Sequence, residues 1–159
     1  MTQAMSDGAA QTMFAADQAS RALGITLLEA RDGAAKLRMT VTAEMVNGHG
    51  TAHGGYLFLF ADTAFACACN SHGPVTVAAG ADISFVRPAR EGDTLTALAE
   101  ERTTYGRSGI YDVTVLRESG PDGRPGGDGH RDGDGASGGE VIAEFRGRSR
   151  TVGRVEGSP

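Results

Sequence analysis

The spacing of apolar and polar residues predicts a strand and a buried helix in the first half of the chain. In AAKLRMTVT (34–42), apolar and polar side chains alternate, as in a half-buried strand. MFAADQASRAL (13–23) predicts a short helix that ends at Gly24. The segment from Gly55 to about Ser71 is apolar on nearly every side, which predicts a long buried helix ended by HGP (72–74).

Four later segments have the composition of strands, and short turns separate some of them. They are Val75–Val86, Thr94–Thr103, Ile110–Arg117 and Val141–Thr151, with turn residues in REGD (90–93) and YGRSG (105–109). This spacing predicts an antiparallel meander. The order of helix, strand, long apolar helix and four strands predicts an α+β domain, with an antiparallel sheet covering one central helix.

Residues 119–139 interrupt this pattern. SGPDGRPGGDGHRDGDGASGG is nearly half glycine and has no apolar residue larger than Ala or Pro, so it predicts a mobile hairpin loop. A calcium-binding Gly/Asp repeat is the alternative, but the regular nine-residue period is missing. The predicted organisation is an N-terminal segment with a short helix (1–36), one domain with this loop (37–153) and a tail (154–159).

Composition limits the kinds of partner. The formal net charge of −5 argues against non-specific binding to nucleic acid. The start of the chain, MTQAMSDGAA, does not resemble a secretory signal, and no apolar run reaches the length of a membrane-spanning helix. Cys67 and Cys69 point to different faces of the predicted helix, which disfavours a disulfide. We therefore expect a reduced, cytoplasmic protein.

Asp62 is the one carboxylate within the long apolar helix. Its neighbours on the helix face include Phe58 and Phe65, so burial is expected to raise its pKa. A carboxylate of this kind suits a general base or a nucleophile near neutral pH. The alternative is a structural carboxylate that hydrogen-bonds a backbone group across a subunit contact.

The glycines at the start of this helix suggest where a substrate carbonyl binds. Gly54 and Gly55 permit close approach of a ligand, and the first N–H groups of a helix have no partner within it. Such N–H groups stabilise a carbonyl oxygen that gains negative charge. Asp62 lies about 12 Å further along the helix axis, too far to act on the same carbonyl. Two antiparallel copies would bring Gly54 of one chain towards Asp62 of the other, so an active site here requires a homodimer.

Other polar residues of this region have more than one interpretation. His49, His53 and His72 can be taken as metal ligands, but the surrounding residues lack convincing ligand spacing, so no metal site is predicted. His53 is expected to fix the loop by hydrogen bonding. Asn47 is a turn former or an amide that positions substrate. Arg146, with the next two alternating arginines, lies on one strand face and can meet phosphates or simply face solvent.

Together these residues resemble a known family. NGHGTAHGGYLFLFADTAFACACNSHG (47–73) is similar to the signature of the PaaI-type acyl-CoA thioesterases of the hot-dog fold. The resemblance continues in ISFVRPAREGDTLTALAEE, GIYDVTV and AEFRGRSRTVG, and covers about residues 39–153. The long loop at 119–139 departs from the family, in which this hairpin is usually short.

The resemblance implies a fold, a reaction and a set of roles. The fold is a hot-dog, and the reaction is hydrolysis of an acyl-CoA thioester, with a phenylacetyl or hydroxyphenylacetyl type of acyl group and no metal or redox cofactor. The Gly54 N–H would polarise the carbonyl, Asp62 of the partner subunit would be the catalytic carboxylate, and Asn47 and His53 would complete the site. A tetramer is implied as well. The candidates for substrate contact are Gly55, Phe58, Arg87, Arg107 and Arg146.

Two other functions remain as alternatives on the same fold. A non-catalytic acyl-CoA sensor should have lost the carboxylate or carry a DNA-binding segment, and the residues before Leu37 are too few and too little basic for one. A hydratase or dehydratase should have a His–carboxylate pair, which His53 and Asp62, nine residues apart, match poorly. The sequence favours the thioesterase.

Overall fold

The computed structural model describes residues 8–119 and 139–153. In chain order its elements are α1 (Ala9–Ala16), α2 (Gln18–Ala22), β1 (Thr26–Arg31), β2 (Ala34–Thr40), the short 3-10 helix η2 (Ala43–Met45), α3 (Gly54–Asn70), β3 (Thr76–Phe85), β4 (Thr94–Tyr105), β5 (Ser108–Arg117) and β6 (Glu140–Thr151). The interior of the predicted Gly/Asp loop, with its calcium-binding alternative, and the tail from residue 154 lie outside the described residues.

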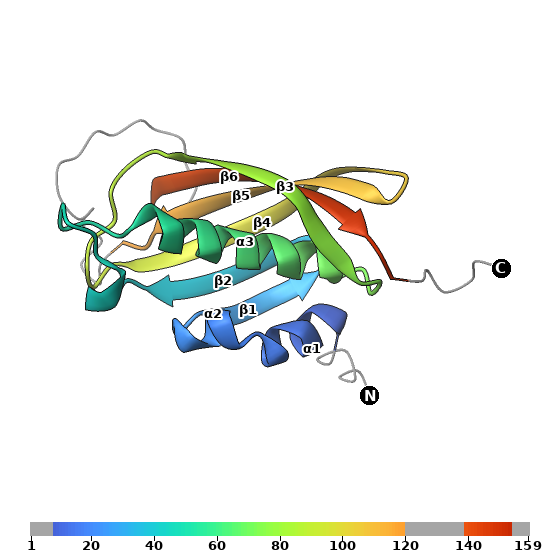
Figure 1. The fold of residues 1–159 in the computed structure, drawn as a ribbon, viewed down its shortest axis with the longest axis horizontal. Coiled ribbons are helices and arrows are strands. Elements are labelled where there is room, and N and C mark those ends of the chain that lie inside the picture. Colours follow the sequence, from blue (N-terminus) through green and yellow to red (C-terminus); the bar gives the residue numbers. More distant parts are fainter. Residues whose placement is uncertain (1–7, 120–138, 154–159) are drawn as a thin grey trace.

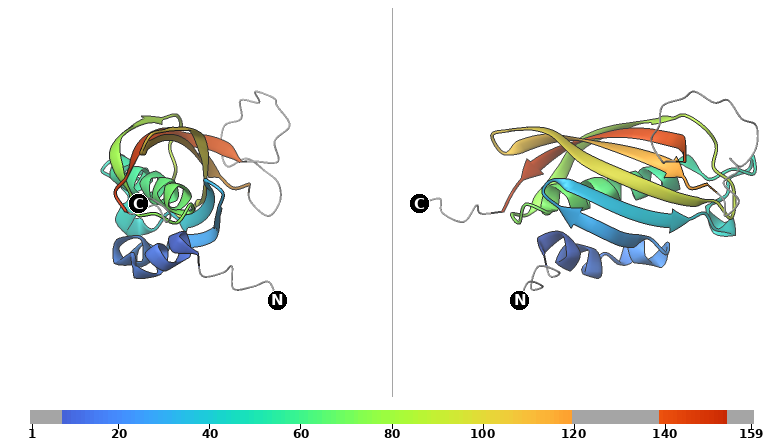
Figure 2. Two further views of the ribbon diagram at one scale, coloured as in Figure 1. Left: turned by 90° about the vertical axis from the view of Figure 1, so that its right-hand side faces the viewer. Right: turned by 180° about the vertical axis from the view of Figure 1, so that it is seen from behind.

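One antiparallel sheet curls around a single long helix. Its six strands lie in the order β1-β2-β4-β5-β6-β3, and α3 runs along the inner face of the sheet (Figure 1). Seen end-on, the sheet surrounds α3 on two sides, while α1 and α2 lie below it (Figure 2). The predicted α+β class and hot-dog arrangement are confirmed, as is the long helix, which begins one residue earlier than expected.

The position of β3 in the sheet differs from the predicted meander. Strands β4, β5 and β6 do form a meander, but β3 pairs with β6 and not with β4. The connection from β3 to β4 therefore spans the sheet, and it ends in the predicted turn, where the Asp93 N–H donates to the Arg90 carbonyl at 3.0 Å. As a result, β3 is an edge strand that lies beside α3 (Figure 1).

The N-terminal region contains more structure than the sequence predicted. The single helix expected at 13–23 is two helices, because Asp17 interrupts the first and caps the second by accepting the Ser20 N–H at 3.0 Å. β1 was not predicted, since TLLEAR does not alternate and has mostly exposed side chains. β1 pairs with β2, so the sheet includes residues of the segment 1–36.

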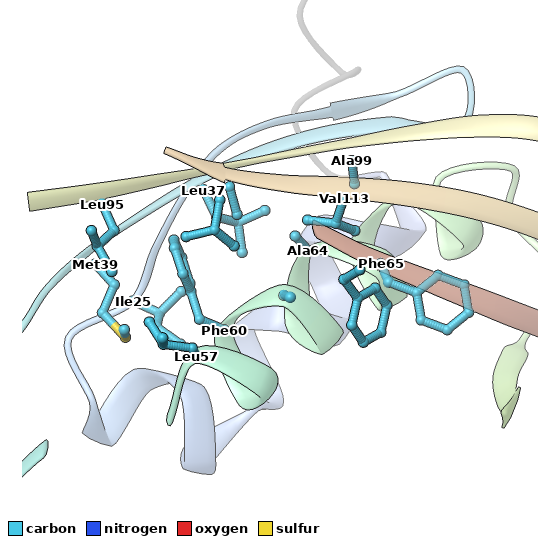
Figure 3. Packing of buried hydrophobic residues seen from close by; sticks show 14 of the residues in the cluster. Ile25, Leu37, Met39, Leu57, Phe60, Ala64, Phe65, Leu95, Ala99 and Val113 are labelled. Carbon is cyan, nitrogen blue, oxygen red and sulfur yellow. The ribbon is translucent and has the colours of Figure 1, made fainter. Parts of the chain in front are cut away.

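The core lies between the inner face of the sheet and α3 (Figure 3). The ring of Phe65 lies 5.5 Å from that of Tyr111 and 5.9 Å from that of Phe145, centroid to centroid. Gly147 makes room for it, because a Cβ there would lie 2.8 Å from the Phe65 ring. Although α3 is largely apolar, none of the helices within residues 8–119 and 139–153 is long and apolar enough to cross a membrane.

Candidate active site

The first turn of α3 leaves one backbone donor free. His53 caps the helix: its Nδ1 accepts the Gly55 N–H at 2.9 Å, and its carbonyl oxygen accepts the Tyr56 N–H at 3.0 Å. Within residues 8–119 and 139–153, the Gly54 N–H has no acceptor. The His53 side chain thus holds the start of α3 by a hydrogen bond, and its role in the reaction stays a prediction. Its capping bonds leave the Gly54 N–H as the donor available to a ligand at this helix end.

The loop before α3 is held by backbone hydrogen bonds and by Asn47. The His53 N–H donates to the Met45 carbonyl at 2.7 Å, and the Ala52 N–H donates to the Ala89 carbonyl at 2.7 Å. Asn47 Oδ1 accepts the N–H groups of His49 at 2.9 Å and Thr51 at 3.2 Å, so the side chain stabilises a turn. The Asn47 amide N–H groups donate to no atom of the described chain, which leaves them available to a substrate.

Phe85, the last residue of β3, explains why position 54 is a glycine. A Cβ on Gly54 would lie 2.9 Å from the Phe85 ring. The Phe85 side chain is 54% exposed, so one face of the ring contacts the helix start and much of it remains open. The sequence did not identify this contact, because β3 and the start of α3 meet only in the folded chain.

Asp62 lies in the middle of α3 on the one face that neither the sheet nor the N-terminal helices cover. At the start of α3, Gly54, Gly55 and Tyr56 are all partly accessible. Further along the helix, the accessible residues lie on the face that begins at Gly55, at Phe58, Leu59, Asp62 and Ala66. Partial burial raises the pKa of Asp62, and the negative charge of Asp17 raises it further. The environment predicted from the sequence is therefore present, with one charge that the prediction did not include.

Asp17 and its partners are a feature that sequence reasoning missed. Asp17 precedes α2, and the Ser20 hydroxyl donates to its Oδ2 at 2.6 Å. Ser20 Oγ also lies 2.8 Å from Oγ1 of Thr63, the residue after Asp62. An Asp three residues before a Ser is a recognisable helix-capping pattern, but its docking against α3 depends on tertiary packing.

The arginines predicted to contact substrate all have partners within the chain. Arg87 pairs with Glu140 at 3.2 Å and donates to the Val141 carbonyl at 3.2 Å. Arg146 forms a bidentate pair with Asp112, at 2.7 and 2.9 Å, on the outer face of the sheet. Arg107 lies in the turn between β4 and β5, where it donates to the Thr151 carbonyl at 3.5 Å. The structure does not bring these three together, and their role in binding phosphate stays a prediction.

The three histidines do not converge. His53 precedes α3 and His72 follows it, so a helix of 17 residues, about 25 Å long, separates them. His72 Nε2 pairs with Glu101 Oε2 at 2.5 Å, and Tyr111 donates to the same oxygen at 2.7 Å. In the two described ranges, no group of three or more His, Cys, Asp or Glu residues is arranged to hold a metal ion.

The aromatic residues of α3 divide between core and surface. Phe65 is 1% exposed and belongs to the core, whereas Phe58 is 37% exposed and lies one turn before Asp62. The Phe58 ring stacks edge-on against Phe145 at 5.4 Å. Tyr56 borders a separate cavity of about 440 Å³ beside Leu23 and Met45. Phe58 is thus the aromatic side chain of α3 that a ligand at Asp62 can reach.

Comparisons with known proteins identify the family. A sequence profile of the thioesterase superfamily matches residues 49–123. The acyl-coenzyme A thioesterase PaaI of Escherichia coli K12 is 40% identical over 144 residues, which are 91% of this chain and 89% of that protein.

Solved structures agree with this assignment. The structure of the E. coli PaaI protein from the phenylacetic acid degradation operon has a TM-score of 0.77 and 39% identity, and the match covers 91% of each chain. A mutant of the phenylacetic acid degradation protein PaaI from Thermus thermophilus has a TM-score of 0.71 and 32% identity, over 86% of this chain and 100% of that one. This chain therefore belongs to the PaaI-type acyl-CoA thioesterases of the thioesterase superfamily.

Proposed function

We propose that the protein hydrolyses a phenylacetyl- or hydroxyphenylacetyl-type CoA thioester at a site shared by two copies of the chain. The observation that carries the proposal is the pair of groups on α3: a free N–H at Gly54 and an accessible carboxylate of raised pKa at Asp62. The names of the two PaaI relatives, with their link to phenylacetic acid degradation, support the choice of acyl group.

The proposed chemistry needs only these groups and water. The Gly54 N–H donates to the thioester carbonyl oxygen and stabilises the negative charge that develops when the carbonyl is attacked. Asp62 removes a proton from water as the water oxygen adds to the carbonyl carbon. The C–S bond then breaks, and the proton passes from Asp62 to the leaving thiolate, which releases CoA and the free acid and leaves Asp62 ionised again. Direct attack by Asp62, with an anhydride that water then opens, uses the same residue. Neither route requires a metal or redox cofactor.

The positions of the two groups support a homodimer. They lie on one straight helix, about 12 Å apart along its axis, whereas both must come within about 3 Å of one carbonyl. A second α3, antiparallel to the first and packed on the accessible face of Gly55, Phe58, Asp62 and Ala66, would supply the missing group to each site.

The edge strand β3 supports the same interface. It pairs with β6 on one side, and it carries no lysine or proline, the residues that often protect an exposed edge. Val77 is 46% exposed, and Phe85 at the other end of the strand is 54% exposed. Pairing of β3 with β3 of a second copy would cover this edge and bring the two α3 helices together.

Ala66→Lys is expected to convert the dimer to a monomer. The side chain of Ala66 lies on the accessible face of α3, one turn beyond Asp62, so a lysine there would fill the space of a partner helix without entering the core. Sedimentation or light scattering should show the mass of a single chain in place of the wild-type assembly, and thioesterase activity should be lost. Ala19→Lys, on the exposed side of α2, is the matched control and should leave the mass unchanged.

Other parts of the assignment are proposals of the same kind. Gly55 and Phe58 would border the acyl group, and Arg87, Arg107 or Arg146 would meet the CoA phosphates only after giving up a present partner. Two dimers would associate as a tetramer, by analogy with the family. Cys67 and Cys69 are free and buried, which supports a reducing compartment such as the cytoplasm.

The experiment that tests this function is release of free thiol from a panel of CoA thioesters. The panel contains phenylacetyl-, hydroxyphenylacetyl-, benzoyl-, short-chain and long-chain CoA. We expect the highest kcat/KM for the phenylacetyl type. Equal turnover of all acyl groups would contradict the proposed specificity. Binding of these esters without any turnover would contradict the thioesterase and support the sensor.

A further inference from the structure

The two N-terminal helices pack against α3 through a buried polar contact. α1 and α2 both contact α3, and Ser20 and Thr63 meet between them with side chains 2% and 6% exposed. Their hydroxyl oxygens are 2.8 Å apart. Buried hydroxyls away from water are retained where their hydrogen bonds are made, so this contact fixes the two elements relative to each other.

A series of hydrogen bonds connects the backbone of α3 to the carboxylate of Asp17. Asp17 accepts twice from Ser20, from its N–H at 3.0 Å and from its hydroxyl at 2.6 Å. The Ser20 hydroxyl donates to Asp17, and the Thr63 hydroxyl donates to the Leu59 carbonyl at 2.9 Å, so the contact between the two hydroxyls shares one of these two hydrogens. The chain of contacts therefore runs from the α3 backbone through Thr63 and Ser20 to a carboxylate.

Thr63 is the residue next to Asp62, so whatever fixes Thr63 also fixes the turn of α3 that carries Asp62. We propose that Asp17 is a positioning residue for the reaction: through Ser20 and Thr63 it sets the orientation of Asp62, and its charge acts on the carboxylate of Asp62. This inference rests on the proposed catalytic role of Asp62. It assigns a function to the N-terminal helices, which otherwise only cover one side of α3.

Of the titratable groups on the elements around Asp62, Asp17 is the one whose charge we expect to affect the Asp62 carboxylate. On α3 itself, burial raises the pKa of both Cys67 and Cys69 to about 12, so these thiols are neutral where a carboxyl titrates. From β5, Tyr111 is neutral as well, because burial and the Glu101 carboxylate raise its pKa. From β3, Asp82 pairs with Arg148 at 3.0 Å on the outer face. His53 lies at the start of the helix.

The sign of the effect follows from the charge. Asp62 must be ionised to act, so activity is lost on the acid side as it becomes protonated. Its pKa is raised by burial first and by Asp17 second. Removing the negative charge of Asp17 lowers the pKa of Asp62, which moves the acid limb of kcat/KM to lower pH. Burial first and the same charge second raise the pKa of Cys67, one turn beyond Thr63.

Four substitutions separate the charge from the hydrogen bonds. Asp17→Asn removes the charge and keeps one of the two oxygen acceptors for Ser20, so we expect the acid limb to move to lower pH, with a smaller loss of kcat on the plateau than when a hydroxyl is removed. Ser20→Ala and Thr63→Val remove the link and keep the charge, so we expect kcat to fall about tenfold at unchanged KM. Thr63→Ser retains the hydroxyl and should restore kcat.

Glu29→Gln is the matched control for charge. Glu29 is exposed on β1, pairs with Arg31 at 2.8 Å, and should leave both the acid limb and kcat unchanged. An acid limb that stays at the wild-type pH in Asp17→Asn, or a full kcat in both Ser20→Ala and Thr63→Val, overturns the inference. Thermal melts check that each variant folds. If Ser20→Ala or Thr63→Val does not fold, the acid limb of Asp17→Asn and the kcat of Thr63→Ser determine whether the inference holds.

A second readout keeps this inference separate from the proposed function. The carboxyl carbon of Asp62 can be titrated by NMR in the labelled protein, whether or not the protein hydrolyses thioesters. A lower Asp62 pKa in Asp17→Asn, with no thioesterase activity in the wild type, would contradict the proposed function and retain the charge coupling. Normal wild-type activity with an unchanged Asp62 pKa in Asp17→Asn would contradict this inference alone.

Discussion

Asp62→Asn is expected to lower kcat for the preferred CoA thioester by about 10² to 10⁴-fold. The asparagine has nearly the same shape, so it keeps the packing of α3 but neither removes a proton from water nor attacks the carbonyl. KM should change little, because Asp62 acts on the reacting atoms and adds little to the binding of CoA. Thiol release under saturating substrate measures the effect, with a thermal melt to confirm folding.

Asp32→Asn is the matched control for this substitution. Asp32 is an exposed carboxylate in the turn between β1 and β2, outside the proposed dimer contact, and its positive φ of 53° is one that asparagine also adopts. We expect wild-type kcat from this variant. Retention of more than a tenth of the wild-type kcat in Asp62→Asn would rule out Asp62 as the base or the nucleophile.

Gly54→Pro is expected to lower kcat by about 10² to 10³-fold, as for loss of one oxyanion donor. Proline removes the Gly54 N–H, and it suits the first position of a helix, where no intrahelical bond is lost. The preceding residue, His53, has φ −62° and ψ 133°, an extended conformation compatible with a following proline. The helix should therefore form normally while the donor is absent.

Gly54→Ala separates the loss of the N–H from the added side chain. Both variants place a Cβ 2.9 Å from the exposed Phe85 ring, which must turn aside, but alanine keeps the N–H. We expect alanine to cost much less activity than proline. Equal losses in the two variants would mean that the Phe85 contact, and not the N–H, determines activity.

The sequence predicted the elements whose signals are local. The apolar run of α3, the turn before β4 and the alternation in β5 depend on residues close in the chain, and these predictions are confirmed. The position of β3 was wrong, because pairing with β6 rather than β4 is decided by contacts between distant segments. β1 was missed because an edge strand with exposed side chains does not show the alternation of a buried one.

The candidate site divides in the same way. Gly54 and His53 were identified from a local motif, since a glycine pair at a helix start and a capping residue are sequence features. Asp62 was identified by its apolar neighbours along the helix. Asp17, Ser20 and Phe85 reach the site from other elements, and only the folded structure brings them near.

The central claim is that each site takes Gly54 from one copy and Asp62 from the other. It is tested most directly by mixing the inactive Asp62→Asn and Gly54→Pro subunits, unfolding them and refolding them together. Random pairing makes half of the dimers mixed, and each mixed dimer has one complete site, so about a quarter of the wild-type activity should return. If the refolded mixture stays as inactive as the two variants alone, although mixed dimers are detected by mass, the shared site is contradicted.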